Sequence, residues 1–110
     1  MARPAGAVRW ADPGLLILGS LADGPRHGYA IVGDVEQTAG VTLGPGTLYG
    51  ALARLEEHGL VEALPGDQRR RPYRITAAGA QALAEQLTTM TRFAKSARGR
   101  LQARTAGGTP

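Results

Sequence analysis

Residues 43–76 read LGPGTLYGALARLEEHGLVEALPGDQRRRPYRIT, and they predict one helix followed by a short hairpin. Pro45 suits the first turn of a helix, and Gly59 suits its C-terminal end. Three leucines between them have the i, i+4, i+7 spacing of one buried helix face: Leu48, Leu52 and Leu55. At roughly 100° per residue, the opposite face carries mostly small residues, so this helix is expected to approach another surface closely. That outer face comprises Gly46, Gly50, Ala53, Arg54 and Glu57, with Thr47 and Tyr49 at its edges.

The residues that follow this helix predict a β-hairpin with a basic tip. Residues 60–64 form a short apolar run, Pro65-Gly66-Asp67 signals a turn, and residues 72–76 alternate as a returning strand. Four arginines are expected on the hairpin: Arg69, Arg70 and Arg71 at the tip and Arg74 on the returning strand. Adjacent like charges repel one another, so the cluster is better suited to bind a polyanion than to stabilise the fold. A solvated charge run is the alternative, but the bare helix face directly before the hairpin favours nucleic acid.

The N-terminal third of the chain predicts two further helices. Asp12 and Pro13 suit the start of the first, and the sequence DGP at residues 23–25 ends it. A second helix is expected over about residues 27–38, and a turn over residues 40–44. The second and third helices then form a helix-turn-helix, and the hairpin is its wing.

Four side chains on the helices are candidate contacts to duplex DNA, in addition to the four hairpin arginines: Tyr29, Thr47, Tyr49 and Arg54. Thr47 and Arg54 are expected to position the third helix in the major groove or to contact bases. Tyr29 lies near the start of the second helix, where its hydroxyl can reach a phosphate beside free backbone amides. Packing of Tyr29 against the third helix is an equally compatible alternative.

A second pattern covers the C-terminal third of the chain. Seven apolar residues recur at alternating spacings of three and four, which is a heptad seam: Ala80, Leu83, Leu87, Met90, Ala94, Ala97 and Leu101. Thr76 can cap a helix over residues 77–104, which is too long for so small a core to cover. We expect a second copy of the chain to cover the seam in a two-fold homodimer, with every seam residue except Ala80 as a dimer contact. A helix that folds back on its own domain is the alternative.

Composition agrees with one small domain that binds an anionic partner. The chain has 110 residues, of which 43% are apolar, and this suffices for a single three-helix core. Residues 1–68 hold 4 arginines against 8 acidic residues, whereas residues 69–110 hold 9 cations against Glu85 alone. The lack of cysteine excludes a disulfide framework and is compatible with the cytoplasm, where we place the protein. The longest apolar run, Leu15 to Leu18, is far too short for a signal-peptide core or a membrane span, and no membrane partner is expected.

The predicted fold class is mainly α with a small β-hairpin. We divide the chain into a flexible N-terminal arm (1–11), a winged helix-turn-helix domain (12–76), a C-terminal dimerisation helix (77–104) and a disordered tail (105–110). An enzyme is excluded because the two histidines, His27 and His58, fall on different elements without a third metal ligand or a nucleophile at suitable spacing. No cofactor and no metal are expected.

Six short motifs, in this order, resemble the PadR family of bacterial transcription regulators: LLILG (15–19), HGY (27–29), PGTLY (45–49), LARLE (52–56), GLV (59–61) and RPYRITAAG (71–79). The resemblance covers about residues 14–80, and the chain length is similar to the short branch of the family, which has one C-terminal dimerisation helix. It implies a DNA-binding homodimer that acts as a repressor. Gly44 stands where the family often has serine, and Gly50 where proline is common, so the resemblance does not fix the contacts in the groove.

The resemblance also implies a small effector. PadR-like regulators often sense planar aromatic or lipophilic compounds near their dimer interface, which makes Trp10 and Phe93 candidate ligand contacts. Packing across the dimer is the alternative role for both residues. The expected function is that of a sequence-specific, ligand-responsive repressor that binds a double-stranded operator as a homodimer. A winged-helix protein-interaction module with weak, non-specific DNA binding is the alternative, and salt separates the two because phosphate contacts weaken steeply as salt rises.

Overall fold

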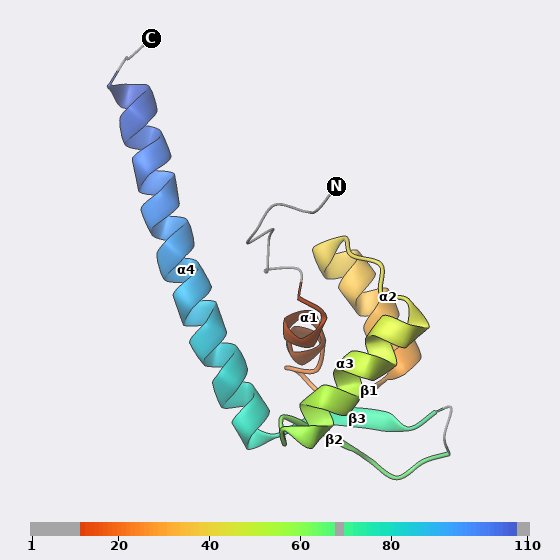
Figure 1. Ribbon diagram of the computed structural model, residues 1–110. Helices are drawn as coiled ribbons and strands as arrows, with labels where there is room; N and C mark the ends of the chain where they lie inside the picture. The colour runs from red at the N-terminus through yellow and green to blue at the C-terminus, as the bar shows by residue number, and fades with distance from the viewer. Residues whose placement is uncertain (1–11, 68–69, 108–110) are drawn as a thin grey trace.

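The computed structural model describes residues 12–67 and 70–107. In these ranges the elements follow in the order α1 (Pro13–Ser20), β1 (Arg26–His27), α2 (Gly28–Ala39), α3 (Pro45–Glu57), β2 (Val61–Ala63), β3 (Pro72–Ile75) and α4 (Ala77–Ala106). The first three helices and the sheet pack together, and α4 leaves them as a long rod (Figure 1). The prediction of a mainly α, winged helix-turn-helix fold with a C-terminal helix is confirmed.

The sheet contains one more strand than the predicted hairpin. Strands β2 and β3 form the hairpin, with Val61 opposite Ile75 and Glu62 opposite Arg74. The short strand β1 adds to the other edge of β3, so the antiparallel order is β1-β3-β2. Because His27 belongs to this strand, the second helix begins one residue later than expected, at Gly28. A strand of two residues is too short to show an alternating pattern of apolar and polar residues, so β1 is recognised only from its pairing with β3.

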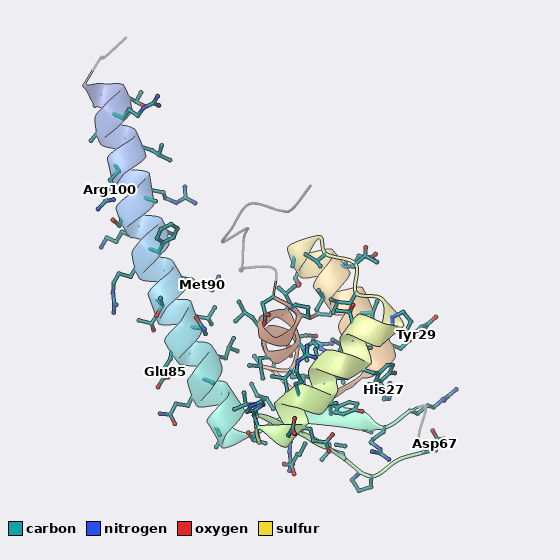
Figure 2. All side chains as sticks on the ribbon, in the orientation of Figure 1. His27, Tyr29, Asp67, Glu85, Met90 and Arg100 are labelled. Carbon is teal, nitrogen blue, oxygen red and sulfur yellow. The ribbon has the colours of Figure 1, made fainter. Side chains whose placement is uncertain are left out.

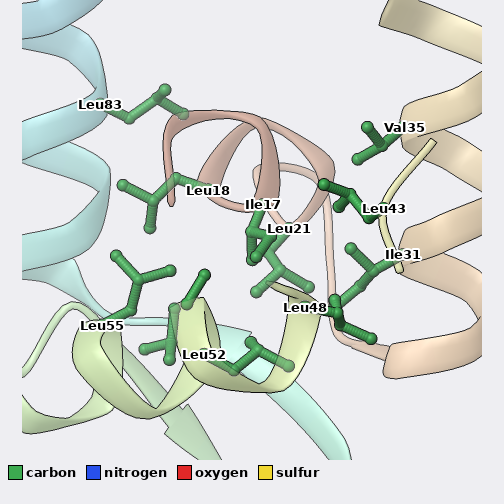
Figure 3. Packing of buried hydrophobic residues seen from close by; sticks show 12 residues of the cluster. Ile17, Leu18, Leu21, Ile31, Val35, Leu43, Leu48, Leu52, Leu55 and Leu83 are labelled. Atoms are coloured by element: carbon green, nitrogen blue, oxygen red, sulfur yellow. The ribbon is translucent and has the colours of Figure 1, made fainter. Parts of the chain in front are cut away.

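One hydrophobic core joins all four helices and the sheet (Figure 3). The three leucines of α3 are all buried, as their spacing predicted. Fully buried side chains of α1, of its C-cap residue and of α2 pack against them: Ile17, Leu21, Ile31 and Val35 are each exposed by 1% or less. The apolar face of α3 is therefore fixed against the core, and its opposite face is turned to solvent.

Helix ends follow the predicted caps. Asp12 Oδ2 accepts a hydrogen bond from the Leu15 backbone amide at 3.1 Å, and Thr76 Oγ1 accepts one from the Gly79 amide at 3.0 Å. Helix α4 continues through Gly99 to Ala106, two residues past the expected end at residue 104. The first two residues of the expected disordered tail are thus helical, and residues 108–110 lie outside the described ranges.

Close packing at Gly79 anchors the start of α4. A Cβ atom added to this residue would lie 2.0 Å from the Leu60 carbonyl oxygen, so only glycine permits this approach. One turn later, Leu83 reaches from α4 toward Leu18 of α1 and joins the core (Figure 3). Beyond that point α4 projects away from the other elements (Figure 1). No helix within the described ranges is long and apolar enough to cross a membrane.

Arg26 joins α1 to the sheet. Its backbone belongs to β1 and pairs with Tyr73 of β3. Its Nε donates to the Ser20 carbonyl oxygen at 2.8 Å, and its Nη2 donates to Asp23 Oδ1 at 3.2 Å. The guanidinium therefore satisfies a carbonyl at the C-terminal end of α1, where a helix lacks internal donors. No sequence pattern singled out this arginine.

Candidate nucleic-acid interface

The outer face of α3 is as bare as its sequence predicted. Thr47 and Arg54 are exposed, and Gly50 between them is half-buried. Gly44 is the N-cap residue, and its lack of a side chain leaves the first amides of α3 without a side-chain cap. A surface of this kind lets a polyanion approach the helix backbone closely, with one guanidinium available at Arg54.

Two tyrosines lie near this face, and the structure decides between the two alternatives for Tyr29. Tyr29 is 91% exposed, so the alternative that it packs against α3 is wrong. Tyr49 of α3 makes the contact between the two helices and packs against the start of α2: a Cβ atom added to Gly28 would lie 2.6 Å from the Tyr49 hydroxyl oxygen. Tyr49 is still 46% exposed and borders the bare face. The glycine of the HGY motif is the signal for this contact, because a larger residue would displace the Tyr49 ring.

The wing carries its charges on a loop that is closed by its own hydrogen bonds. The Arg70 amide donates to the Asp67 side chain at 2.9 Å and to the Asp67 carbonyl oxygen at 3.1 Å. The side chain of Arg70 is exposed, and that of Arg71 is half-buried. Arg69, the other expected tip contact, lies outside the described residues. Tyr29 and the wing residue Asp67 lie on the same side of the molecule in Figure 2.

Arg74, the expected DNA contact on the returning strand, is paired with a carboxylate of its own hairpin. It stands opposite Glu62 in the hairpin, and its Nε donates to Glu62 Oε2 at 3.1 Å while its Nη2 donates to the same oxygen. The two side chains are 52% and 47% exposed, so water screens the pair and its net stabilisation is small. Glu62 thus competes with any anion for Arg74. The strand register alone brings the two residues together, because they are twelve positions apart in the sequence.

Tyr73 of strand β3 packs against the core in a partly desolvated position. Burial raises the pKa of its hydroxyl, and the charges of Glu56 and the nearby Tyr49 raise that pKa further, whereas Arg71 lowers it. The hydroxyl therefore stays neutral at physiological pH.

The seam residues of α4 fall into two groups. Leu83 is 7% exposed because the core of its own chain covers it, so it is not available to a partner as the heptad pattern had suggested. Leu87 and Leu101 are 47% and 61% exposed. Met90 and Ala97 are half-buried, and Ala94 is exposed.

The two candidate effector contacts differ in what the structure describes. Phe93 is 74% exposed on α4 and has a free ring. Trp10 lies outside the described residues. Within residues 12–67 and 70–107, no group of three or more His, Cys, Asp or Glu side chains is arranged to hold a metal ion.

Comparison with known proteins identifies a family. Residues 17–85 match the model of the transcriptional regulator PadR-like family, which is more than half of the chain. A protein of transposon TN4556 from Streptomyces fradiae, described as an uncharacterised 37.1 kDa protein, is 49% identical over 86 residues. The match covers 78% of this chain and 25% of that protein, so the chain spans about a quarter of this relative's length.

Solved structures agree in fold over nearly their whole length. A PadR family transcription regulator from Clostridium difficile is 27% identical, with a TM-score of 0.68 and coverage of 82% of this chain and 97% of that one. RosR of H. salinarum is 29% identical, with a TM-score of 0.67 and coverage of 94% of each chain.

Proposed function

This chain belongs to the PadR-like family of transcriptional regulators, and we propose that it represses transcription by binding an operator in duplex DNA as a homodimer. The family is one of transcriptional regulators and not of enzymes, in agreement with the exclusion of an enzyme from the sequence. We place its action in the cytoplasm, where bacterial DNA lies.

One observation carries the proposal: the bare, exposed face of α3 lies beside an arginine-rich wing. An α-helix fits the major groove, and a face of glycine, alanine and threonine lets the helix lie deep in it. Thr47 and Arg54 then reach base edges or the flanking backbone, with Tyr49 at the edge of the contact.

Phosphate contacts come from the surrounding elements. Tyr29 projects from the first turn of α2, and its hydroxyl donates to a phosphate beside the helix amides. Arg70 and Arg71 of the wing, together with Arg69, neutralise backbone phosphates or enter the minor groove. Arg74 joins them when DNA displaces Glu62.

A titration of labelled DNA tests the proposal. The fragment upstream of the chain's own gene is compared with an unrelated fragment of equal length, each at two salt concentrations. The proposal requires tight, selective binding that weakens steeply as salt rises, because each displaced counterion contributes to the slope. Weak binding to both fragments at both salt concentrations would contradict it and would favour a protein-interaction module.

Ligand response belongs to the same proposal. The exposed Phe93 ring offers a planar apolar surface, and Trp10 is the only tryptophan, so its fluorescence reports on binding near it. Titration with planar aromatic compounds should give a saturable fluorescence change that is reduced by Phe93→Ala. No saturable change with any compound would remove the effector from the proposal.

A further inference from the structure

Three elements of the proposed interface meet at the side chain of Tyr49. This residue belongs to α3, and the hydroxyl end of its ring lies against Gly28, the first residue of α2. It is also close enough to Tyr73 of β3 to raise the pKa of the Tyr73 hydroxyl. Strand β3 pairs with β1 at Arg26, two residues before Gly28. The Tyr49 ring therefore lies where the start of α2, the helix α3 and the wing come together.

The space beside Gly28 is fully occupied. A Cβ atom added there would lie 2.6 Å from the Tyr49 hydroxyl oxygen, 3.1 Å from Tyr49 Cζ and 3.1 Å from Leu48 Cδ2. Leu48 is 2% exposed and fixed in the core, whereas Tyr49 is 46% exposed and can move outward. A side chain at residue 28 would therefore push the Tyr49 ring toward solvent, beside the bare face of α3.

The contact with Tyr49, and not the backbone, requires glycine at residue 28. Within the described ranges, the glycines with positive φ are Gly24, Gly40 and Gly59, so Gly28 has a backbone conformation that other residues adopt. Alanine is favoured over glycine inside a helix. A substitution of Gly28 by alanine thus tests the contact without straining the chain.

The Tyr49 hydroxyl acts through its volume. It forms no hydrogen bond with any residue in the ranges 12–67 and 70–107. Its neighbour across the contact, Gly28, is followed by Tyr29, which is 91% exposed. His27 and Tyr29 lie beside α3 in Figure 2. The position of the Tyr49 ring therefore affects the separation between Tyr29 and the outer face of α3.

We propose that Tyr49 is a positioning residue for operator recognition: its ring fixes the separation of α2 and α3, and Gly28 provides the space for it. Phosphate contacts set the orientation of a protein on the duplex, while base contacts are made in the groove. Tyr29 and the outer face of α3 must therefore keep one separation to reach both at once. The inference rests on the proposed function and deepens it by assigning two residues that act without reading a base.

A double-mutant cycle on the operator tests this role. Gly28→Ala should weaken operator binding about tenfold, because the added methyl group displaces the Tyr49 ring. Tyr49→Phe should bind within about twofold of the wild type, because the ring remains and no hydrogen bond is lost.

The combined variant gives the decisive result. Removing the hydroxyl oxygen relieves the 2.6 Å contact and leaves the nearest atoms at 3.1 Å, so Gly28→Ala with Tyr49→Phe should recover to within about threefold of the wild type. Such a rescue cannot arise if alanine at residue 28 only blocks DNA or only perturbs α2. Gly99→Ala is the matched control, because no atom lies within 4 Å of its added Cβ, and it should leave operator binding unchanged within about twofold.

A second measurement contains no DNA. Backbone amide chemical shifts of residues 50–57, measured by heteronuclear NMR, should change in Gly28→Ala and return in the combined variant to their values in Tyr49→Phe. Thermal unfolding verifies that each variant is folded. If the wild type does not select its operator, the proposed function fails, while the amide shifts still decide whether Gly28 and Tyr49 position α3.

Three results would overturn the positioning role. The first is an α3 whose amide shifts are the same in Gly28→Ala as in the wild type. The second is a combined variant that binds the operator no better than Gly28→Ala. The third is a loss in Tyr49→Phe as large as that in Gly28→Ala, which would make the Tyr49 hydroxyl a direct DNA contact.

Discussion

The two halves of α4 share one heptad spacing and one continuous helix, yet they have different environments. In the proximal half, residues 77–90, the core of the same chain buries Leu83 to 7% exposure. In the distal half, residues 91–106, Leu101 at the same seam remains 61% exposed. The seam predicts an apolar face in both halves, but it does not specify what covers that face. Tertiary contacts bury Leu83 in the first half and leave Leu87 47% exposed, and we assign the second half to a partner copy.

This difference separates the free energy of folding from the free energy of association. Burial of Leu83 stabilises the single chain, because the apolar surface leaves water when the chain folds. Leu101 is exposed in the single chain, so its burial contributes to the free energy of association when a partner packs against it. Substitutions in the two halves should therefore change different measurements.

Glycine substitutions give the largest expected contrast. Gly79→Ala places a Cβ atom 2.0 Å from the Leu60 carbonyl oxygen, so α4 must shift away from the sheet. We expect the free energy of unfolding to fall by about 4 kcal/mol in chemical denaturation. Gly99→Ala is the control in the distal half, where no atom lies within 4 Å of the added Cβ, and it should stabilise the helix by up to about 1 kcal/mol. If the two variants change the free energy of unfolding equally, the two halves of α4 do not differ in how closely they pack.

Leucine truncations give the next contrast. Leu83→Ala should lower the free energy of unfolding by about 3 kcal/mol, because it opens a cavity beside Leu18. Leu101→Ala should change monomer stability by less than about 0.5 kcal/mol and should instead weaken dimerisation. Denaturation at a concentration below the dimer dissociation constant measures the first quantity, and sedimentation measures the second. A large loss of monomer stability for Leu101→Ala would show that the distal half is covered within its own chain.

Arg54→Ala tests an exposed residue that lies on α3 and not on α4. Dimerisation and stability should be unchanged. If Arg54 contacts a base, discrimination between operator sequences should fall by about 1–3 kcal/mol, whereas loss of a phosphate contact weakens binding to all sequences alike. Binding titrations with operator variants distinguish the two outcomes. A loss below a few tenths of a kcal/mol on every sequence would remove Arg54 from the interface.

Glu62→Gln should have the smallest effect. The pair with Arg74 is half-exposed, so its removal should cost less than about 1 kcal/mol of stability. The freed guanidinium should strengthen binding to non-specific DNA a few-fold and increase the salt dependence. Glu85→Gln removes one negative charge from exposed α4 and should leave DNA binding unchanged, which makes it the matched control. Unchanged affinity for Glu62→Gln would mean that DNA does not recruit Arg74.

Local chemistry made much of the fold predictable. Leucine spacing identified the buried face of α3, and Asp12 and Thr76 marked two helix starts because their side-chain oxygens accept free backbone amides. The bare face of α3 follows from the same spacing, since burying one side of a helix exposes the other.

Long-range pairing was not predictable in the same way. Strand β1 exists only because β3 offers it an edge, and Glu62 meets Arg74 only through the hairpin register. Tyr49 occupies the space beside Gly28, whereas the neighbouring Tyr29 is 91% exposed. These contacts join residues that are distant in sequence, and no local periodicity encodes which of them will meet.

The helices, the wing, the basic C-terminal half and the family motifs can all be read from the amino-acid sequence, because each depends on residues a few positions apart. Which apolar residues the single chain buries depends on its tertiary packing, which covers Leu83 and leaves Leu87 and Leu101 of the same seam 47% and 61% exposed. A side chain is buried only when a second surface packs against the face that carries it. The heptad pattern predicts the apolar face of α4, but the tertiary fold determines whether another surface packs against that face.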